Sequence, residues 1–439
     1  MSKNLVLVES PAKGKTIEKY LGTDFKVLAT YGHVRDLVSK TGAVIPDQGF
    51  EMNYEISEDS KKQLTKITKA VEQAKTLYLA TDLDREGEAI AWHVQEILKE
   101  RGLLTDKEVH RVVFNAVTKR AVQDSIKHPK VVSDSLVDAY KARRALDHLF
   151  GFNLSPLMWE KIAPKLSAGR VQSPALRLIV EREDQISAFE PQEYWTIGAI
   201  AKHKEEVFRA RLSKYEGEKT KQFSFTNEKT VREVEGAIKA LADGILTVGK
   251  VEKKQRQRKP TAPFITSTLQ QEASRKLGFS ARQTMMTAQR LYEGIDVGDG
   301  SEGLITYMRT DSVTLAGEAI AEIRSLIQDR YGPENLPDEP RTYQTNTQNA
   351  QEAHEAVRPT SVSRTPVELK SRLDADQHRL YELIWKRTVA SQMNNAIFDT
   401  VGLNIFPGEN REGDTSFRAT GQVLVKPGFM AVYQEGMDD

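Results

Sequence analysis

Apolar and polar positions alternate with two different periods in the first 120 residues. NLVLVES (4–10) and TLYLATD (76–82) contain short apolar runs that predict strands. TIEKYLG (16–22) and EAIAWHVQEILKE (88–100) have apolar residues at helical spacing and predict helices. Strand–helix alternation of this kind predicts an α/β layer with a mostly parallel sheet.

The pattern changes beyond residue 130. Residues 133–185 have mainly helical periodicity, and residues 193–250 alternate as strands. A proline-marked boundary, KPTAPF (259–264), precedes two further helix patterns at 267–278 and 282–294. The pair Leu304–Ile305 predicts a short strand, residues 365–393 predict helix, and residues 396–433 alternate again as strands. Strand patterns on both sides of a helical region indicate one domain inserted into another.

Composition narrows the class of protein but does not reveal a partner. With 63 basic and 62 acidic residues, overall charge says nothing about nucleic acid, so any DNA binding must come from local basic tracks. One such track, KKQRQRK (253–259), is typical of a solvated face or linker. The absence of cysteine excludes disulfides and cysteine-ligated zinc within the chain. No apolar run approaches the ~18 residues that span a bilayer, so we expect a cytoplasmic protein.

ESPAKGKT (9–16) nearly matches a phosphate-binding P-loop. Its first position is Glu9 instead of glycine, and a carboxylate there would face the phosphates, which argues against ATP binding. We therefore interpret Glu9 as an acidic residue at a strand end with Lys13 close by. That arrangement suits an active site at the carboxyl edge of a sheet.

TDLDREGE (81–88) places three acids directly after a predicted strand. In extended chain Asp82, Asp84 and Glu86 would point the same way and repel each other unless a cation lies between them. Oxygen ligands of this kind suit Mg²⁺, with water completing the coordination. An EF-hand is excluded because its twelfth position is His93. The alternative is a solvated acidic turn that caps the following helix.

LITYMRTDS (304–312) raises the question of whether Tyr307 packs or reacts. A phenol titrates near ~10 and is a poor nucleophile at neutral pH without help. Arg309 would lie on the same face of a strand, where a cation lowers the pKa of the phenol and can hold a phosphate. A tyrosine in a strand can equally be a core residue.

The remaining candidates are weaker when each is taken alone. His354 begins HEAVR, but Arg358 replaces the second histidine of a zinc-protease helix. KARRALDH and SAGRVQSP carry polar residues on helix faces or at a helix start, where arginine binds phosphate well, although ordinary surface charge is the alternative. These residues are Arg143, Arg144, Asp147, Arg170 and Gln172.

Eight motifs in order resemble the bacterial type IA DNA topoisomerases, of the topoisomerase I branch. They are ESPAKGKT, DLDREGE, ARRALD, SAGRVQS, PTAPFITSTLQQEA, TMMTAQRLYEG, LITYMRTDS and AHEAVRPT, and they span nearly the whole chain. The family core extends further than this chain, and often continues into zinc ribbons or basic modules. The resemblance therefore implies a chain without the rest of the base domain and the C-terminal modules.

The resemblance implies a role for each site residue. Tyr307 would be the nucleophile, Arg309 would bind the scissile phosphate, and Lys13 would lie near it. Glu9 would also handle the proton of the 3′-oxygen, and His354 would support the tyrosine. The implied Mg²⁺ ligands are Glu9, Asp82, Asp84 and Glu86. The residues implied to line the single-strand path are His33, Arg111, Arg143, Arg144, Asp147, Arg170 and Gln172.

The resemblance also implies a fold and a domain organisation. It is an α/β Toprim domain within an α+β multi-domain toroid, with mixed helices and antiparallel strands in an arch. The implied domains are a Toprim domain at 1–130 with an excursion near 37–63, a helical base segment at 131–190, arch strands at 191–255 and 394–439, and an inserted helical domain at 256–393 that carries the tyrosine.

The implied activity is ATP-independent relaxation of negatively supercoiled DNA through a 5′-phosphotyrosine intermediate. The implied partner is single-stranded DNA, and the implied protein is a monomer of the cytoplasm and nucleoid. Three alternatives remain open: a topoisomerase III-like decatenase, a Toprim nuclease or primase that needs only the acids and metal, and a non-catalytic single-strand binding protein.

Overall fold

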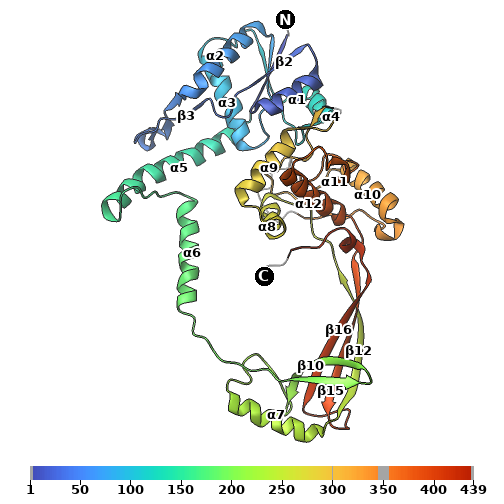
Figure 1. Ribbon diagram of the computed structural model, residues 1–439. Helices are drawn as coiled ribbons and strands as arrows, with labels where there is room; N and C mark the ends of the chain where they lie inside the picture. Colours follow the sequence, from blue (N-terminus) through green and yellow to red (C-terminus); the bar gives the residue numbers. More distant parts are fainter. Residues whose placement is uncertain (1–2, 299, 345–354, 437–439) are drawn as a thin grey trace. The chain divides into compact units, whose positions relative to one another are not determined.

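The structure is a computed structural model that describes residues 3–298, 300–344 and 355–436. The chain divides into two compact units, each built from segments distant in sequence. Unit 1 comprises Met1–Val180, Thr261–Gln392 and Val432–Asp439, and unit 2 comprises Glu181–Pro260 and Met393–Ala431. Each unit is described by itself below (Figure 1).

A four-stranded parallel sheet organises the first part of unit 1. Its strand order is β2-β1-β7-β8, with Val8 of β1 opposite Ala29 of β2 and Leu7 opposite Leu79 of β7. The strands are β1 (Asn4–Val8), β2 (Phe25–Ala29), β7 (Thr76–Leu79) and β8 (Glu108–Arg111). Because the strands are parallel and in register, the loops that follow β1 and β7 emerge side by side at one sheet edge.

Helices cover both faces of this sheet. α2 (Glu58–Gln73) and α3 (Arg85–Glu100) supply Leu64, Ile67, Val94 and Ile97 to a core against β1 and β7. α1 (Pro11–Leu21) and α4 (Lys119–Lys127) pack together on the other side (Figure 1). The predicted parallel α/β layer is thus the observed one.

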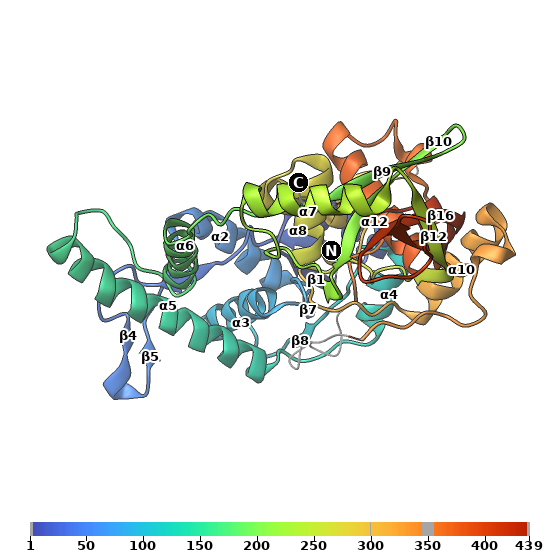
Figure 2. The ribbon, with the colours of Figure 1, turned by 90° about the horizontal axis from the view of Figure 1, so that it is seen from below.

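Short strands and long helices follow the sheet in unit 1. β3 (Arg35–Leu37) pairs with β6 (Tyr54–Ile56), and β4 (Val44–Ile45) pairs with β5 (Glu51–Met52) beyond the turn η1 (Pro46–Gln48). Figure 2 shows the β4–β5 hairpin beside α5 (Asp134–Lys161), which is followed by α6 (Gln172–Ser187). Within the described residues, no helix has both the length and the apolarity to cross a bilayer.

The second part of unit 1 is helical. It contains α8 (Thr266–Leu277), α9 (Ala281–Glu293), α10 (Gly317–Tyr331), η2 (Pro333–Asn335), α11 (Pro366–Leu369) and α12 (Ala375–Ser391). A small hairpin, β13 (Ile295–Asp296) with β14 (Ser301–Glu302), lies on α1, where the Tyr20 hydroxyl donates to the Ser301 carbonyl at 2.9 Å. The helix predicted over 365–393 is two helices, because Asp374 caps a new helix at Ala375.

The strand predicted at Leu304–Ile305 does not form. Residue Ile305 makes one isolated bridge to Pro359, and the backbone N–H groups of Leu304, Thr306 and Tyr307 donate to three different segments. Since no single neighbouring strand offers a continuous ladder, residues 303–316 form an irregular loop.

Unit 2 is built on an antiparallel sheet that α7 covers, and it begins within α6 at Glu181. The sheet order is β11-β10-β16-β15-β12, and β9 pairs with β10. The strands are β9 (Gly198–His203), β10 (Glu206–Tyr215), β11 (Glu218–Lys219), β12 (Leu246–Arg258), β15 (Ala396–Pro407) and β16 (Ser416–Lys426), followed by η3 (Gly428–Ala431). α7 (Glu228–Ala242) packs Val231, Val234 and Ile238 onto Leu212 and Phe417 of the sheet.

Two expectations for this region need correction. The segment 191–255 was expected to be strands, yet α7 occupies its middle, with apolar residues at helical spacing and an Asn227 N-cap. Residues 394–439 were expected to be arch strands throughout. Strand structure ends at Lys426, and residues 432–436 belong to unit 1, where the Tyr433 hydroxyl donates to the buried Glu272.

Candidate active site

The loop after β1 places Glu9 and Lys13 at the edge of the parallel sheet. The Ser10 hydroxyl caps α1 by accepting from the Lys13 backbone N–H at 3.2 Å, so the helix begins directly after the strand. Glu9 Oε1 accepts from the Asp82 backbone N–H at 2.8 Å, which joins this loop to the loop after β7. Lys13 is buried, and its Nζ donates to Asp82 Oδ1 at 2.6 Å.

The loop after β7 is not extended, contrary to the prediction that Asp82, Asp84 and Glu86 point the same way. Asp84 is the N-cap of α3, with its Oδ1 accepting from the Gly87 N–H at 2.9 Å, so Glu86 already lies in the first helical turn. Gly87 is needed here because a Cβ would overlap the Asp82 backbone. Asp84 therefore caps the helix, as the alternative interpretation predicted, and it also lines the cavity described below.

Arg111 supports the acidic loop from inside the protein. Only 1% of the residue is exposed; its Nε donates to Glu88 at 2.8 Å, and its guanidinium donates to the carbonyls of Thr81 and Asp82. A guanidinium with this many buried partners cannot also reach a DNA backbone. The assignment of Arg111 to the single-strand path is therefore corrected: it fixes the backbone that carries the acids.

Tyr307 lies on an irregular segment held by hydrogen bonds to the loop that follows β8. Its backbone N–H donates to the Asn115 carbonyl at 2.7 Å, and the Gly303 N–H donates to the Val117 carbonyl at 3.0 Å. These bonds bring the phenol to the acidic loop, where Tyr307 Oη donates to Asp84 Oδ2 at 2.6 Å. Arg309 Nη1 lies 3.8 Å from the same oxygen, and 57% of its side chain is exposed.

Burial dominates the titration of this site. It raises the pKa of the Tyr307 phenol, and the charges of Asp82 and Asp84 raise it further; Arg309 opposes this with a smaller effect. Arg309 thus acts in the expected direction, but burial and the two carboxylates outweigh it. Burial followed by the Asp82 charge also raises the pKa of Glu9, to about 8, so Glu9 holds a proton near neutral pH.

These groups line one cavity. A space of about 400 Å³ is bounded by the four acids, by Tyr307 and Arg309, and by residues of α9. The four acids are Glu9, Asp82, Asp84 and Glu86. A second cavity of about 730 Å³ shares Glu9, Asp84 and Arg309 and extends toward His33 and Arg143.

The acids supply the oxygen donors that Mg²⁺ prefers, but they are spread over the cavity wall. Among the described residues, no three acidic or histidine side chains converge on one point. Asp82 is held by Lys13, Asp84 accepts from Tyr307, and Glu86 accepts from His33 at 3.3 Å. Burial, followed by the charge of Asp82, raises the pKa of Glu9, and Lys13 only partly opposes this. The donor set therefore fits a hydrated cation bound by one or two carboxylates.

Three of the polar residues predicted on helix faces, Arg143, Asp147 and Arg170, form a chain of ion pairs that reaches Glu86 at the cavity. Arg143 Nη1 lies 3.8 Å from Glu86, and Asp147 pairs with Arg143 at 3.9 Å and with Arg170 at 2.7 Å. Gln172 is the first residue of α6 and accepts from Ser167 at 3.4 Å. Arg144 instead pairs with Asp36 at 2.5 Å, and His33 stacks on Tyr140.

The sequence did not identify every residue that shapes the site. Asn115 donates its side-chain amide to Glu355, whose other oxygen accepts from the Ala316 N–H at 2.6 Å, so this pair links the loop after β8 to the tyrosine segment. Tyr292 is fully buried with its ring against Tyr307. No motif or periodicity in the sequence indicates that Asn115, Glu355 and Tyr292 contribute to the site. His354 lies outside the described residues.

Comparison with known proteins identifies the family. A model described as DNA topoisomerase matches residues 131–439, and a model described as Toprim domain matches residues 4–117. The chain belongs to the DNA topoisomerase family. The resemblance inferred from the eight motifs is thereby confirmed, and the α/β Toprim and mixed helix–strand architecture is that of this family.

Individual relatives support this family assignment. The chain is 56% identical over 440 residues to DNA topoisomerase 1 of Xylella fastidiosa strain Temecula1. The aligned region covers 100% of this chain and 54% of that relative. DNA topoisomerase 1 of Rickettsia bellii is 51% identical over 437 residues, or 99% of this chain and 54% of the relative. The chain therefore spans about half the length of these curated relatives.

A solved structure agrees with the fold. Full-length topoisomerase I from Thermotoga maritima matches with a TM-score of 0.82 at 35% sequence identity, over 99% of this chain and 70% of that chain.

Proposed function

We propose that this chain is the strand-cleaving part of a type IA DNA topoisomerase, which relaxes negatively supercoiled DNA without ATP. It breaks one strand through a 5′-phosphotyrosine intermediate, lets a second strand pass, and rejoins the break. The observation that carries the proposal is the hydrogen bond from Tyr307 Oη to Asp84 Oδ2 at 2.6 Å, because it aims a buried phenol into the cavity lined by the acids.

The cleavage step follows from the groups on the cavity wall. Tyr307 Oη attacks the phosphorus, a bond forms between them, and the bond from phosphorus to the 3′-oxygen breaks. The proton of the phenol passes to Asp84, its hydrogen-bond acceptor, and Glu9 gives its proton to the leaving 3′-oxygen. Religation is the same step in reverse, so the phosphotyrosine bond conserves the energy and no ATP is needed.

The cations have separate tasks. Arg309, an exposed cation of the cavity, would hold the scissile phosphate, while buried Lys13 neutralises Asp82 and opposes the rise in the pKa of Glu9. Mg²⁺, when bound by Asp82, Asp84, Glu86 or Glu9, would supply positive charge to the phosphate and to the acids. We propose that the residues which guide the single strand to this cavity are His33, Arg143, Arg144, Asp147, Arg170 and Gln172. We further propose that the protein acts as a monomer at the nucleoid.

The test uses a single-stranded oligonucleotide labelled at its 3′ end. Wild-type protein stopped with denaturant should retain the label covalently, because the 5′-phosphate side of the break stays on Tyr307. Tyr307→Phe should lose this adduct completely, whereas Tyr331→Phe, a tyrosine on α10, should keep it.

The outcomes separate the alternatives. If Tyr307→Phe still cuts the strand and no adduct forms, a Toprim nuclease replaces the proposal. If DNA is bound and neither protein cuts it, a binding protein is favoured. Relaxation of a negatively supercoiled plasmid and decatenation of linked circles would then distinguish the topoisomerase I and III types of activity.

A further inference from the structure

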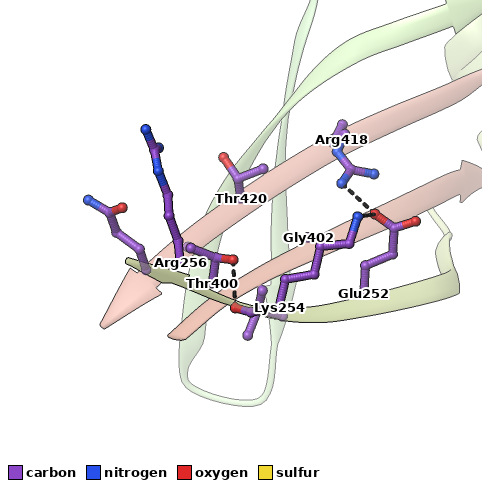
Figure 3. A pocket seen from close by; sticks show the side chains of 10 residues that line it. Glu252, Lys254, Arg256, Thr400, Gly402, Arg418 and Thr420 are labelled. Atoms are coloured by element: carbon purple, nitrogen blue, oxygen red, sulfur yellow. Dashed lines mark hydrogen bonds and ion pairs between the residues drawn. The ribbon is translucent and has the colours of Figure 1, made fainter. Parts of the chain in front are cut away.

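A separate cavity of about 550 Å³ lies on the sheet of unit 2, and it shares no residue with the two cavities of unit 1. It is formed by the three adjacent strands β12, β15 and β16 (Figure 3). The lining side chains used below are Glu252, Lys254, Arg256, Thr400, Arg418, Thr420 and Gln422.

Strand alternation explains why these side chains share a face. Lys254 pairs with Thr400, which pairs with Gln422, and Glu252 pairs with Gly402, which pairs with Thr420. Residues of opposite parity on the same strands, such as Leu403 and Ala419, pack with the core under α7. Gly402 keeps the middle of the polar face low, because a Cβ there would collide with the Arg418 guanidinium.

Some charged side chains of this face form ion pairs with one another, and Arg256 does not. Arg418 Nη2 lies 2.9 Å from Glu252, and Lys254 Nζ lies 4.0 Å from it. Figure 3 draws these side chains on the sheet. Arg418 and the neighbouring Lys250 hold the pKa of Glu252 near 2, so this carboxylate is ionised. Figure 3 shows Arg256 pointing away from Glu252. Arg256 forms no ion pair with any described residue.

The neutral lining adds hydrogen-bond donors. The Thr420 hydroxyl and the Gln422 amide lie beside the cations and make no hydrogen bond within the described part of the chain. The cavity lining itself contains no aromatic side chain on which a base could stack, although Phe398 is the cross-strand partner of Arg256 at its end. Cations, hydroxyls and an amide without aromatics match a phosphodiester backbone, which carries acceptor oxygens at regular intervals.

We propose that the Lys254–Arg256–Thr420 face of unit 2 binds the phosphodiester backbone of DNA without reading its sequence. It deepens the proposed function, on which it rests, by giving DNA a holding surface separate from the residues that cut it. It also assigns a role to the basic track KKQRQRK: alternate residues of the track face this cavity, and the others face away.

The first experiment measures binding of a single-stranded oligonucleotide to the full chain over a range of salt concentrations. The double variant Lys254→Gln/Arg256→Gln should weaken binding roughly tenfold at low salt. It should also reduce the slope of log affinity against log salt by the amount that about two phosphate contacts contribute. The control Lys253→Gln/Lys229→Gln removes the same charge from the opposite face of β12 and from α7, and should change both values little. Equal weakening in both double variants overturns the proposal.

Removing the carboxylate should act in the opposite direction. Glu252→Gln releases Arg418 and removes a charge that repels phosphate, so binding should tighten roughly threefold and the salt slope should steepen. Unchanged or weaker binding would contradict the assignment of this face.

A crosslinking measurement locates the DNA independently of affinity. Because the chain has no cysteine, Gln422→Cys and Lys253→Cys each give a unique thiol for a photoreactive probe on opposite faces of the sheet. The probe at 422 should crosslink to DNA and the probe at 253 should not. Equal crosslinking, or none at 422, overturns the proposal. Duplex competitor should displace the strand as well as single-stranded competitor does, because only the backbone is held.

Failure of this inference differs from failure of the proposed function. Lys254→Gln/Arg256→Gln should still form the Tyr307 adduct on a short oligonucleotide, since none of its changes touches the cavity of unit 1. If wild-type protein forms no adduct but the crosslink at 422 appears, the proposed cleavage fails and the binding face stands.

Discussion

The cavity of unit 1 and the polar face of unit 2 use similar residue types under opposite conditions. In unit 1, Arg111 pairs with Glu88 at 2.8 Å, with 1% and 4% of the side chains exposed. In unit 2, Arg418 pairs with Glu252 at 2.9 Å, with 38% and 23% exposed. The N–O distances of the two pairs are nearly equal, but the exposure of their side chains differs widely.

The difference separates two kinds of function. Buried charges cost so much to strip of water that each must keep its partner, so the cavity of unit 1 works by fixed geometry and shifted pKa values. Half-exposed charges are screened and can exchange partners, so the face of unit 2 works by the number of cations it presents. Under our two proposals, chemistry belongs to the first region and reversible holding of DNA to the second.

The largest expected effect tests burial directly. Arg111→Met should lower the free energy of unfolding by roughly 3–5 kcal/mol, because Glu88 and several carbonyls lose their buried donor. The matched change Arg418→Met should cost no more than about 1 kcal/mol. Urea denaturation of both variants gives the two values. Equal losses would mean that the two regions do not differ in the way described.

The next effect concerns pH and Glu9. Its pKa is raised from 4.5 to about 8 in the folded protein, so between these values the folded state binds more protons than the unfolded state. Stability should therefore fall as pH rises through this window, by at most about 1.4 kcal/mol per pH unit. Glu9→Gln cannot titrate and should flatten the curve, as measured by urea denaturation with a chelator present.

Magnesium sharpens the same measurement. A cation bound beside Glu9 favours its ionised form, so added Mg²⁺ should reduce the pH slope of the wild type and leave Glu9→Gln unchanged. A slope that ignores Mg²⁺ would argue against a metal ligand role for Glu9. This readout does not depend on cleavage.

The smallest effect on stability separates capping from chemistry. Asp84→Ala removes the cap of α3 and the acceptor of Tyr307, and Thr118→Ala removes the equivalent cap of α4, where Thr118 accepts from the Ala121 N–H. Both should lose about 1 kcal/mol of stability. Only Asp84→Ala should also slow formation of the covalent adduct. Similar adduct rates in both variants would reduce Asp84 to a helix cap.

Local sequence signals gave most of the fold. Apolar runs of four or five residues predicted β1 and β7, and helical spacing predicted α3, because short-range periodicity decides these elements. The same signal was present in α7, where Val231, Val234 and Ile238 recur at helical spacing, but strand patterns on both sides hid it. Leu304–Ile305 misled because a two-residue apolar run does not say whether a partner strand exists.

The types of residue in the sequence identified candidate site residues, but they did not predict which contacts those residues make. A carboxylate at a P-loop position and three acids after a strand singled out the cavity wall. Nothing in the local pattern distinguished Arg111, which is buried under the acids, from Arg309, which is exposed above them. An arginine of either kind looks the same in the sequence, because its role depends on how many segments surround it.

The sequence by itself determined the parallel α/β layer, the family and the residue types available for chemistry, since these depend on periodicity and on motifs within short segments. Tertiary structure decided that Tyr307 donates a hydrogen bond to Asp84, 223 positions away in the chain. It also decided that Lys13 pairs with Asp82 and that burial raises the pKa of Glu9. These outcomes arise from desolvation and distance between remote segments, and neither quantity exists until the chain is folded.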